Sequence, residues 1–174
     1  MSYNPKDHYF KKAKKENFVA RSIYKLEEID KKFKIIKKND IIVDLGASPG
    51  SWSQYCLKQV GKQGKVIGID LNPVNFKDSD YIFYQENIFE INWEDIKQKH
   101  EISEFNVVIS DMAPKTTGIR LTDQTRSFEL CMKALEVSDS FLSQRGHFVC
   151  KFFHSNDYKN LLTEMKKRFK QVES

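Results

Sequence analysis

Apolar residues recur along this chain in short runs that alternate with segments of helical spacing. The short runs are rich in β-branched residues and are bounded by glycine, proline or acidic residues, which is the pattern of buried strands. Between them, apolar positions three or four residues apart predict amphipathic helices. The predicted strands are Ile41–Leu45, Lys65–Asp70, Tyr81–Gln85, Asn106–Asp111, His147–Phe153 and a sixth beginning at Gln171-Val172, and the predicted helices cover residues 17–33, 51–60, 93–100, 123–142 and a last segment after Ser155.

This alternation of strands and helices predicts an α/β protein with a mostly parallel, doubly wound sheet of the Rossmann-like type. We expect a single domain over residues 1–174, because this length suits one hydrophobic core. Ligands of such sheets bind beyond the carboxyl ends of the strands. Four of the predicted strands end in an ionisable residue, which packing alone does not explain. These residues are Asp44, Asp70, Asp111 and Lys151.

The first predicted strand leads into a turn of small residues, D-L-G-A-S-P-G at residues 44–50, that opens the next helix. Small residues let a ligand approach the backbone, and the free N–H groups of the new helix face that ligand. The spacing G-x-x-x-G differs from both the dinucleotide-binding pattern and the P-loop. It is typical of proteins that bind S-adenosylmethionine. The motif therefore predicts a methyltransferase whose donor site includes Asp44, Gly46, Pro49 and Gly50.

Three further residues are candidates for the donor site. Asp70 ends the second strand twenty residues after Gly50, the position from which a carboxylate accepts hydrogen bonds from both hydroxyls of a ribose. Asn87 follows the third strand, where it either contacts the adenine amino group or is an ordinary turn residue. Trp52 packs either on the methionine end of the donor or on the sheet.

Positive charge is concentrated at the N-terminal end of the chain. Residues 1–38 form a basic arm and helix with a net charge of +7, whereas residues 39–174 carry −2. Concentrated positive charge is a feature of proteins that bind polyanions, although a charge run alone is more often a solvated helix face. Beside a methyl-donor site, this region predicts RNA as the partner, with an affinity that falls steeply with salt.

Other classes of protein are disfavoured by composition. No apolar run approaches the roughly 20 residues that span a membrane, and the N-terminus lacks the apolar core of a secretory signal. We therefore expect a cytoplasmic monomer without membrane contacts. Cys56, Cys131 and Cys150 are odd in number and widely spaced, so they predict reduced thiols rather than a disulfide framework. No cluster of potential ligands predicts a metal site.

The sequence D-M-A-P at residues 111–114 bears on the methyl acceptor. Enzymes that methylate a base amino group tend to carry [D/N]-P-P and an aromatic residue, which hold and stack a flipped base. Methionine and alanine replace those features here. Carbon methylation would need a thiol in a loop beside the donor, but Cys56 and Cys150 fall in a predicted helix and a predicted strand. An oxygen is the remaining acceptor.

A ribose 2'-hydroxyl is a weak nucleophile whose proton must leave as the methyl group arrives. Lysine is a reasonable base for that proton. Lys151 fits this role, because a charged residue in an otherwise apolar strand is costly unless it is paired or functional. Lys25 can supply a second cation, and Asp111 can orient both lysines.

Taken together, the motifs resemble the FtsJ-type family of RNA 2'-O-ribose methyltransferases over roughly residues 8–170. Several linked motifs at consistent spacing are more specific than one glycine turn. The resemblance is strongest to the compact bacterial-type enzymes that methylate a uridine ribose in large-subunit ribosomal RNA. The matching motifs are Arg21-Ser22-x-x-Lys25-Leu26, Val43-Asp44-Leu45-Gly46-Ala47-Ser48-Pro49-Gly50-x-Trp52-Ser53-Gln54, Asp70-Leu71-x-Pro73, Ser110-Asp111-Met112-Ala113-Pro114-x-x-x-Gly118 and Lys151-x-Phe153.

The family uses a Lys-Asp-Lys-Glu tetrad, and its glutamate lies on a late strand, whereas this sequence ends at Ser174 before such a residue. We expect the natural protein to continue into a last strand hairpin, because a sheet that ended at Val172 would leave strand edges exposed. The adenine-contacting residue is usually an acid in the relatives, and here it is an amide, whose oxygen can still accept a hydrogen bond. The resemblance implies Lys25, Asp111 and Lys151 as catalytic residues, with Lys151 as proton acceptor, and Gly50, Trp52, Asp70, Asn87 and Asp111 at the donor site.

Two alternatives stand beside ribosomal RNA 2'-O-methylation. One is methylation of transfer RNA or of an mRNA cap by an enzyme of the same family. The other is an RNA-binding protein that keeps the donor fold without catalysis. Lys25, Asp111 and Lys151 argue against the second alternative, while the missing glutamate argues for it.

Overall fold

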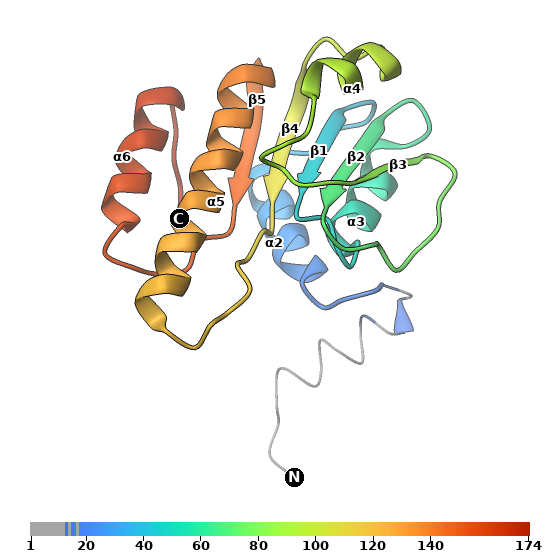
Figure 1. Ribbon diagram of the computed structural model, residues 1–174. Coiled ribbons are helices and arrows are strands. Elements are labelled where there is room, and N and C mark those ends of the chain that lie inside the picture. The colour runs from blue at the N-terminus through green and yellow to red at the C-terminus, as the bar shows by residue number, and fades with distance from the viewer. Residues whose placement is uncertain (1–12, 14, 17) are drawn as a thin grey trace.

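The computed structural model describes residues 13, 15–16 and 18–174, so residues 1–12, the first part of the predicted basic arm, lie outside the described residues (Figure 1). Five strands form one parallel sheet in the order β3-β2-β1-β4-β5. This is the predicted doubly wound α/β architecture. The elements are α2 (Ile23–Phe33), β1 (Ile41–Leu45), α3 (Ser51–Val60), β2 (Lys65–Asp70), β3 (Tyr81–Gln85), α4 (Trp93–His100), β4 (Phe105–Ser110), α5 (Arg120–Phe141), β5 (Leu142–Cys150) and α6 (Tyr158–Arg168).

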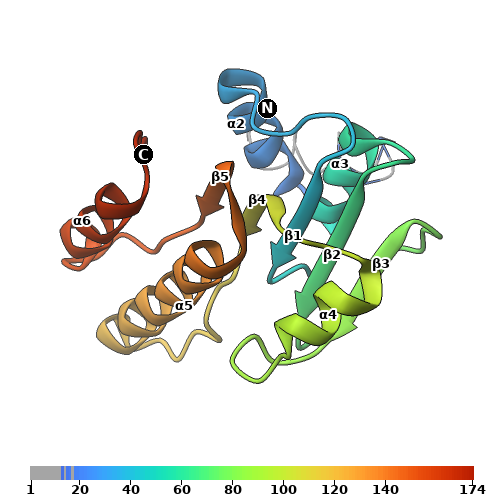
Figure 2. The same cartoon turned by 90° about the horizontal axis from the view of Figure 1, so that it is seen from above.

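Helices cover both faces of the sheet and give it two separate apolar cores (Figure 2). Successive residues of a strand point to opposite faces, so Ile42 packs toward α2 and α3 while Val43 packs toward α4 and α5. Burial on both faces explains why the central strands are apolar throughout rather than alternating. At the far edge, α6 packs beside α5, and the ring of Phe169 stacks on Phe148 of β5.

Five elements have the bounds that the sequence predicts: β1, α3, β2, β3 and α4. The elements that follow differ. Strand β4 begins and ends one residue earlier than predicted, so Asp111 lies just beyond it, and α5 begins three residues earlier. Strand β5 starts at Leu142 directly after α5 and ends at Cys150, so the prediction that Lys151 lies inside the strand is wrong. Pairing with β4 determines these limits.

The sixth strand predicted at Gln171-Val172 is absent from the structure, in which residues 171–174 have no regular secondary structure. A strand exists only when its backbone bonds to a neighbouring strand, and this segment pairs with none of the described residues. The β propensity of two residues does not create such a pairing.

The N-terminal helix is also shorter than predicted. The apolar spacing predicts a helix from Asn17, which lies outside the described residues, but α2 begins at Ile23. The preceding segment is held on α3 instead, because Gln54 accepts a hydrogen bond from the Val19 amide and the hydroxyls of Ser22 and Ser51 lie 2.6 Å apart. None of the helices in the described part of the chain is both long and apolar enough to cross a membrane.

Candidate active site

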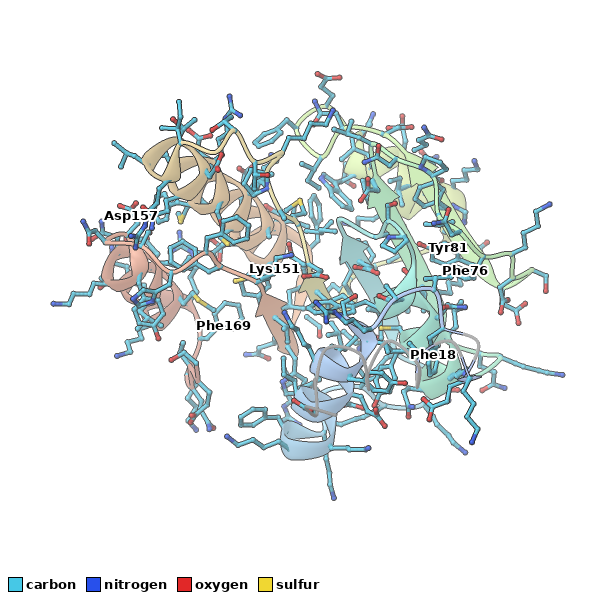
Figure 3. The ribbon with its side chains drawn as sticks, turned by 90° about the horizontal axis from the view of Figure 1, so that it is seen from below. Phe18, Phe76, Tyr81, Lys151, Asp157 and Phe169 are labelled. Carbon is cyan, nitrogen blue, oxygen red and sulfur yellow. The ribbon has the colours of Figure 1, made fainter. Side chains whose placement is uncertain are left out.

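The parallel strands bring their carboxyl ends to one edge of the sheet, and the four predicted strand-end residues meet there. Asp44 is the penultimate residue of β1, and Asp70 is the last residue of β2. Asp111 and Lys151 directly follow β4 and β5. Figure 3 looks onto this edge, with Lys151 between the side that carries α5 and the side that carries Phe76 and Tyr81. The predicted convergence is therefore present.

Both glycines of the turn after β1 are required by the backbone. Gly46 has a φ of 79°, and a Cβ at this residue would lie 2.6 Å from Cγ of Met112. Gly50 has a φ of 111° at the start of α3, and a Cβ there would lie 2.4 Å from the ring of Phe76. Only glycine tolerates both the conformation and the close approach. The turn is thus packed tightly between the segments that follow β2 and β4.

The carboxylate of Asp70 is oriented by the backbone around it. Its Oδ2 accepts a hydrogen bond from the Ser48 amide at 3.0 Å, and its Oδ1 accepts one from the Asn72 amide at 2.7 Å. Oδ1 also accepts a longer hydrogen bond from the Asn72 side-chain amide, at 3.2 Å. Oδ2 keeps one lone pair free, and a ribose hydroxyl at Oδ1 would replace the Asn72 side chain. Asp70 therefore joins the turn after β1 to the end of β2 and presents its carboxylate at the edge of the sheet.

Asp44 belongs to a buried chain of hydrogen bonds. The hydroxyl of Ser53 donates to Asp44 Oδ2 at 2.6 Å, and the same hydroxyl lies 2.9 Å from the hydroxyl of Tyr81. The Tyr81 hydroxyl fits above Gly68, where any Cβ would clash with it. This chain links α3, β1 and β3 beneath the donor turn and rigidifies it.

The other oxygen of Asp44, Oδ1, is buried without a hydrogen-bond partner. Burial raises the pKa of Asp44 to about 7, the hydrogen bond from Ser53 opposes that rise, and the nearby charges of Asp111 and Asp70 add to it. The buried carboxyl group of Asp44 therefore lies close to two partly exposed carboxyl groups. Such a site favours a cationic ligand, because positive charge relieves the repulsion among them. S-adenosylmethionine, with its sulfonium and ammonium groups, fits this requirement.

Lys151 and Asp111 form a close pair although they are 40 residues apart. Lys151 Nζ donates to the Asp111 carboxylate at 2.6 Å and to the Asp111 backbone carbonyl at 2.7 Å. Both side chains remain accessible, at 27% and 21% of their surfaces respectively. The backbone of Lys151 is fixed from both sides, since its amide donates to Ser110 and its carbonyl accepts from the Cys131 thiol. The pair is rigid but open to a substrate.

The remaining predicted residues are either exposed or have contacts that serve the fold. Lys25 is exposed in the first turn of α2, and within the described structure it forms no ion pair with Asp111. Trp52 is buried among α2, α3 and the sheet, and its indole N–H donates to the Ser22 carbonyl at 2.9 Å, so packing accounts for this side chain. Pro49 accepts a hydrogen bond from the Asn75 amide at its carbonyl, which holds the loop after β2 over the glycine turn.

Asn87 has the contacts of a turn residue. Its side-chain oxygen accepts from the Phe89 amide at 3.2 Å, and its amide nitrogen donates to Glu90 at 3.1 Å. The side chain thus stabilises the turn after β3, which is the second of the two predictions made for it. An adenine contact would add to these local bonds.

Sequence reasoning assigned no role to Ser53 or Tyr81. Ser53 lies in the first turn of α3, nine residues after Asp44, without a distinguishing pattern. Gly68 was the available signal for Tyr81, because a glycine inside a strand often marks the close approach of another group. Within the described residues, no group of three or more His, Cys, Asp or Glu side chains is placed to hold a metal ion.

Comparison with known proteins assigns this geometry to a family. The model of the FtsJ-like methyltransferase family matches residues 18–174. The chain belongs to the FtsJ-like methyltransferases. Ribosomal RNA large subunit methyltransferase E of Bdellovibrio bacteriovorus is 57% identical over 175 residues, covering 100% of this chain and 89% of that protein. The predicted family, enzyme class and use of S-adenosylmethionine are therefore confirmed.

Solved structures agree with this membership. The crystal structure of a Plasmodium falciparum protein assigned as a ribosomal RNA methyltransferase superposes with a TM-score of 0.82 at 28% identity, covering 90% of each chain. An Aeropyrum pernix fibrillarin with natively bound S-adenosyl-L-methionine has a TM-score of 0.54 at 14% identity, covering 76% of this chain and 58% of the fibrillarin. The second likeness concerns the fold alone and confirms the Rossmann-like class.

Proposed function

We propose that this FtsJ-like methyltransferase transfers a methyl group from S-adenosylmethionine to the 2'-hydroxyl of a uridine in large-subunit ribosomal RNA. The observation that carries this function is the open Lys151–Asp111 pair beside the donor turn. The close relationship to a ribosomal RNA large subunit methyltransferase supports this substrate over transfer RNA or an mRNA cap. Family membership likewise favours catalysis over RNA binding alone.

The donor site is formed by the ends of β1 and β2. Asp70 accepts hydrogen bonds from the ribose hydroxyls of the donor, and the turn between Gly46 and Gly50 allows its backbone to approach the ligand closely. Asp44 and Asp111 provide negative potential for its positive groups. When bound, S-adenosylmethionine supplies a methyl carbon whose bond to sulfur breaks as its bond to the acceptor oxygen forms.

Lys151 accepts the proton of the ribose hydroxyl. To accept this proton, the Lys151 ammonium must first release one of its own to solvent, which leaves an amine with two N–H groups and one lone pair. The carbonyl and the carboxylate of Asp111 accept those two N–H groups, so the lone pair points away from Asp111 toward the substrate. The geometry therefore orients the base before the substrate arrives. Such advance positioning of a reacting group contributes much of the rate acceleration of an enzyme.

Lys25 serves as a second cation near the acceptor, and the basic region at residues 1–38 binds RNA phosphates. The affinity for RNA should then fall steeply as salt rises. A protein that acts on bacterial ribosomal RNA works in the cytoplasm, and we propose that this chain does so as a monomer.

The first test measures transfer of labelled methyl from S-adenosylmethionine to large-subunit ribosomal RNA. Once the acceptor is mapped, a matched RNA carrying a single 2'-deoxy substitution at that nucleotide is offered. We expect transfer to vanish with the 2'-deoxy RNA. Persistent transfer would identify a base as the acceptor and would remove the roles given to Lys25 and Lys151.

A further inference from the structure

The segment between β4 and α5 exposes large apolar side chains beside cations. Ile119 and Leu121 are 63% and 75% exposed and lie only two residues apart, and neighbouring exposed apolar side chains are a feature of interaction sites. Lys115 and Arg120 are exposed on the same short segment. We refer to these four residues as the β4–α5 surface. Figure 1 shows that this segment extends beyond the carboxyl edge of the sheet, the edge at which β4 and β5 end.

The backbone of this segment is held in a defined conformation. Asp123 accepts hydrogen bonds from the amide and the hydroxyl of Thr117, at 2.8 and 2.9 Å. The bond from the Thr117 amide is the main reason that the pKa of Asp123 lies below its ordinary value. Asp123 is buried, and it is the only acid between residues 112 and 126. The negative charge of Asp123 is therefore buried, whereas the exposed charges of this segment, on Lys115 and Arg120, are positive.

Contacts at both ends connect this segment to the reaction centre. It begins at Met112, which packs against Gly46 of the donor turn and directly follows Asp111. Where the segment enters α5, the side chain of Gln124 donates to the His154 carbonyl at 2.8 Å, three residues beyond Lys151. The β4–α5 surface thus borders the opening in which the Asp111–Lys151 pair is accessible.

We propose that the β4–α5 surface binds the single-stranded RNA that flanks the methylated nucleotide. Lys115 and Arg120 would contact phosphates, while Ile119 and Leu121 would pack on the faces of unstacked bases. RNA is favoured over a protein partner because exposed cations alternate with apolar side chains and no exposed acid is present between residues 112 and 126. This inference rests on the proposed function and adds a second RNA contact, separate from residues 1–38.

The apolar part of the surface is tested with two double variants of the full chain. Ile119→Ser/Leu121→Ser should raise KM for a protein-free transcript of large-subunit ribosomal RNA about tenfold, because the variant loses apolar surface that the bases would remove from water. Ile119→Val/Leu121→Met keeps most of the apolar surface and should leave KM within about twofold. The Kd for S-adenosylmethionine should be unchanged in both. An unchanged KM in the serine variant, or an equal rise in the conservative one, overturns the proposal.

The cationic part is tested with Arg120→Glu against Arg145→Glu. Arg145 is exposed in β5 near its amino end, away from the reaction centre. Only Arg120→Glu should weaken binding of the transcript and lower the salt dependence by roughly one phosphate contact. If Arg120→Glu and Arg145→Glu weaken binding of the transcript equally, the β4–α5 surface is not a specific RNA-binding site.

Two further outcomes distinguish RNA binding at this surface from a protein contact and from failure of the enzyme as a whole. Loss of transfer on assembled large subunits, with normal transfer to the protein-free transcript, would identify a protein as the partner and overturn the proposal. If the unmodified enzyme methylates no RNA, the proposed function itself fails. If the unmodified enzyme and all variants methylate RNA equally, only the β4–α5 surface is rejected.

Discussion

The two halves of the sheet serve the reaction in different ways. In the donor half, built from β1, β2, β3 and α3, buried polar side chains bond to one another beneath the glycine turn, as Asp44, Ser53 and Tyr81 do. In the acceptor half, built from β4, β5 and α5, the Asp111–Lys151 pair proposed to act on the acceptor is open to solvent, and the adjoining segment exposes apolar residues.

This difference matches the two kinds of ligand. One small donor of fixed shape is bound best by a preformed site whose groups are already oriented. A long RNA needs an accessible surface, because its phosphates and bases must reach the enzyme without first entering a cavity. Changes in the donor half should therefore alter donor affinity and folding, whereas changes in the acceptor half should alter transfer.

Removing Lys151, the proposed base of the acceptor half, should have the largest effect on methyl transfer. Lys151→Ala should lower kcat about 10²- to 10⁴-fold, the usual contribution of a positioned base. The Kd for S-adenosylmethionine, measured by calorimetry, should change little. Lys133→Ala, which removes another ion-paired lysine of the same half, provides the control. Transfer that survives the loss of Lys151 would exclude it as the proton acceptor.

The buried acid of the donor half should make folding depend on pH. The pKa of Asp44 is raised to about 7 in the fold, so the folded state holds a proton that the unfolded state loses at lower pH. This group therefore destabilises the fold progressively as pH rises from about 4 to about 7. Urea unfolding at pH 5 and pH 8 measures the effect.

The free energy of unfolding of the wild type should fall between pH 5 and pH 8. In Asp44→Asn this fall should be smaller by an amount on the order of 2–4 kcal/mol. The exposed substitution Asp80→Asn should keep the wild-type pH dependence. If Asp44→Asn and the wild type respond identically to pH, Asp44 is ionised throughout this range.

Removal of the carboxylate proposed to bind the donor ribose should lower the affinity for the donor. Asp70→Ala removes a charged acceptor and the bond to the Ser48 amide, so the Kd for S-adenosylmethionine should rise about 10- to 100-fold. Asp80→Ala, in the loop before β3, should bind normally. Similar Kd values for Asp70→Ala and Asp80→Ala would place the donor ribose elsewhere.

The smallest effect is expected from a single hydroxyl. Tyr81→Phe removes the end of the buried chain and should weaken S-adenosylmethionine binding about 2- to 10-fold, the value of one hydrogen bond. Tyr84→Phe removes a hydroxyl from the same strand that bonds to His100 instead. It should lower stability by about 1 kcal/mol without changing the donor Kd. If Tyr81→Phe and Tyr84→Phe change the Kd for S-adenosylmethionine equally, the hydrogen-bond chain from Tyr81 to Asp44 plays no part in donor binding.

The elements of the donor half, and α4 after them, could be predicted to the residue, because local signals mark where they begin and end. Gly61 and Gly64 separate α3 from β2, and Asn92 caps α4 by accepting hydrogen bonds from two amides of its first turn. In the acceptor half, α5 runs into β5 without a turn residue, so the boundary at Leu142 depends on pairing with Phe105 across the sheet. Local patterns carry no information about that pairing.

The sequence by itself determined the α/β class, the donor turn and the residues at the strand ends, because these follow from short-range backbone preferences and the parallel alignment of strands. Only the tertiary structure decided which side chains meet. Lys151 reaches Asp111 across 40 residues, and Tyr81 reaches Ser53 across 28. Ile119 and Leu121 are left exposed, although their side chains are as apolar as those of the core. Contacts and exposure depend on how strands pair and helices pack in space, which local preference does not encode.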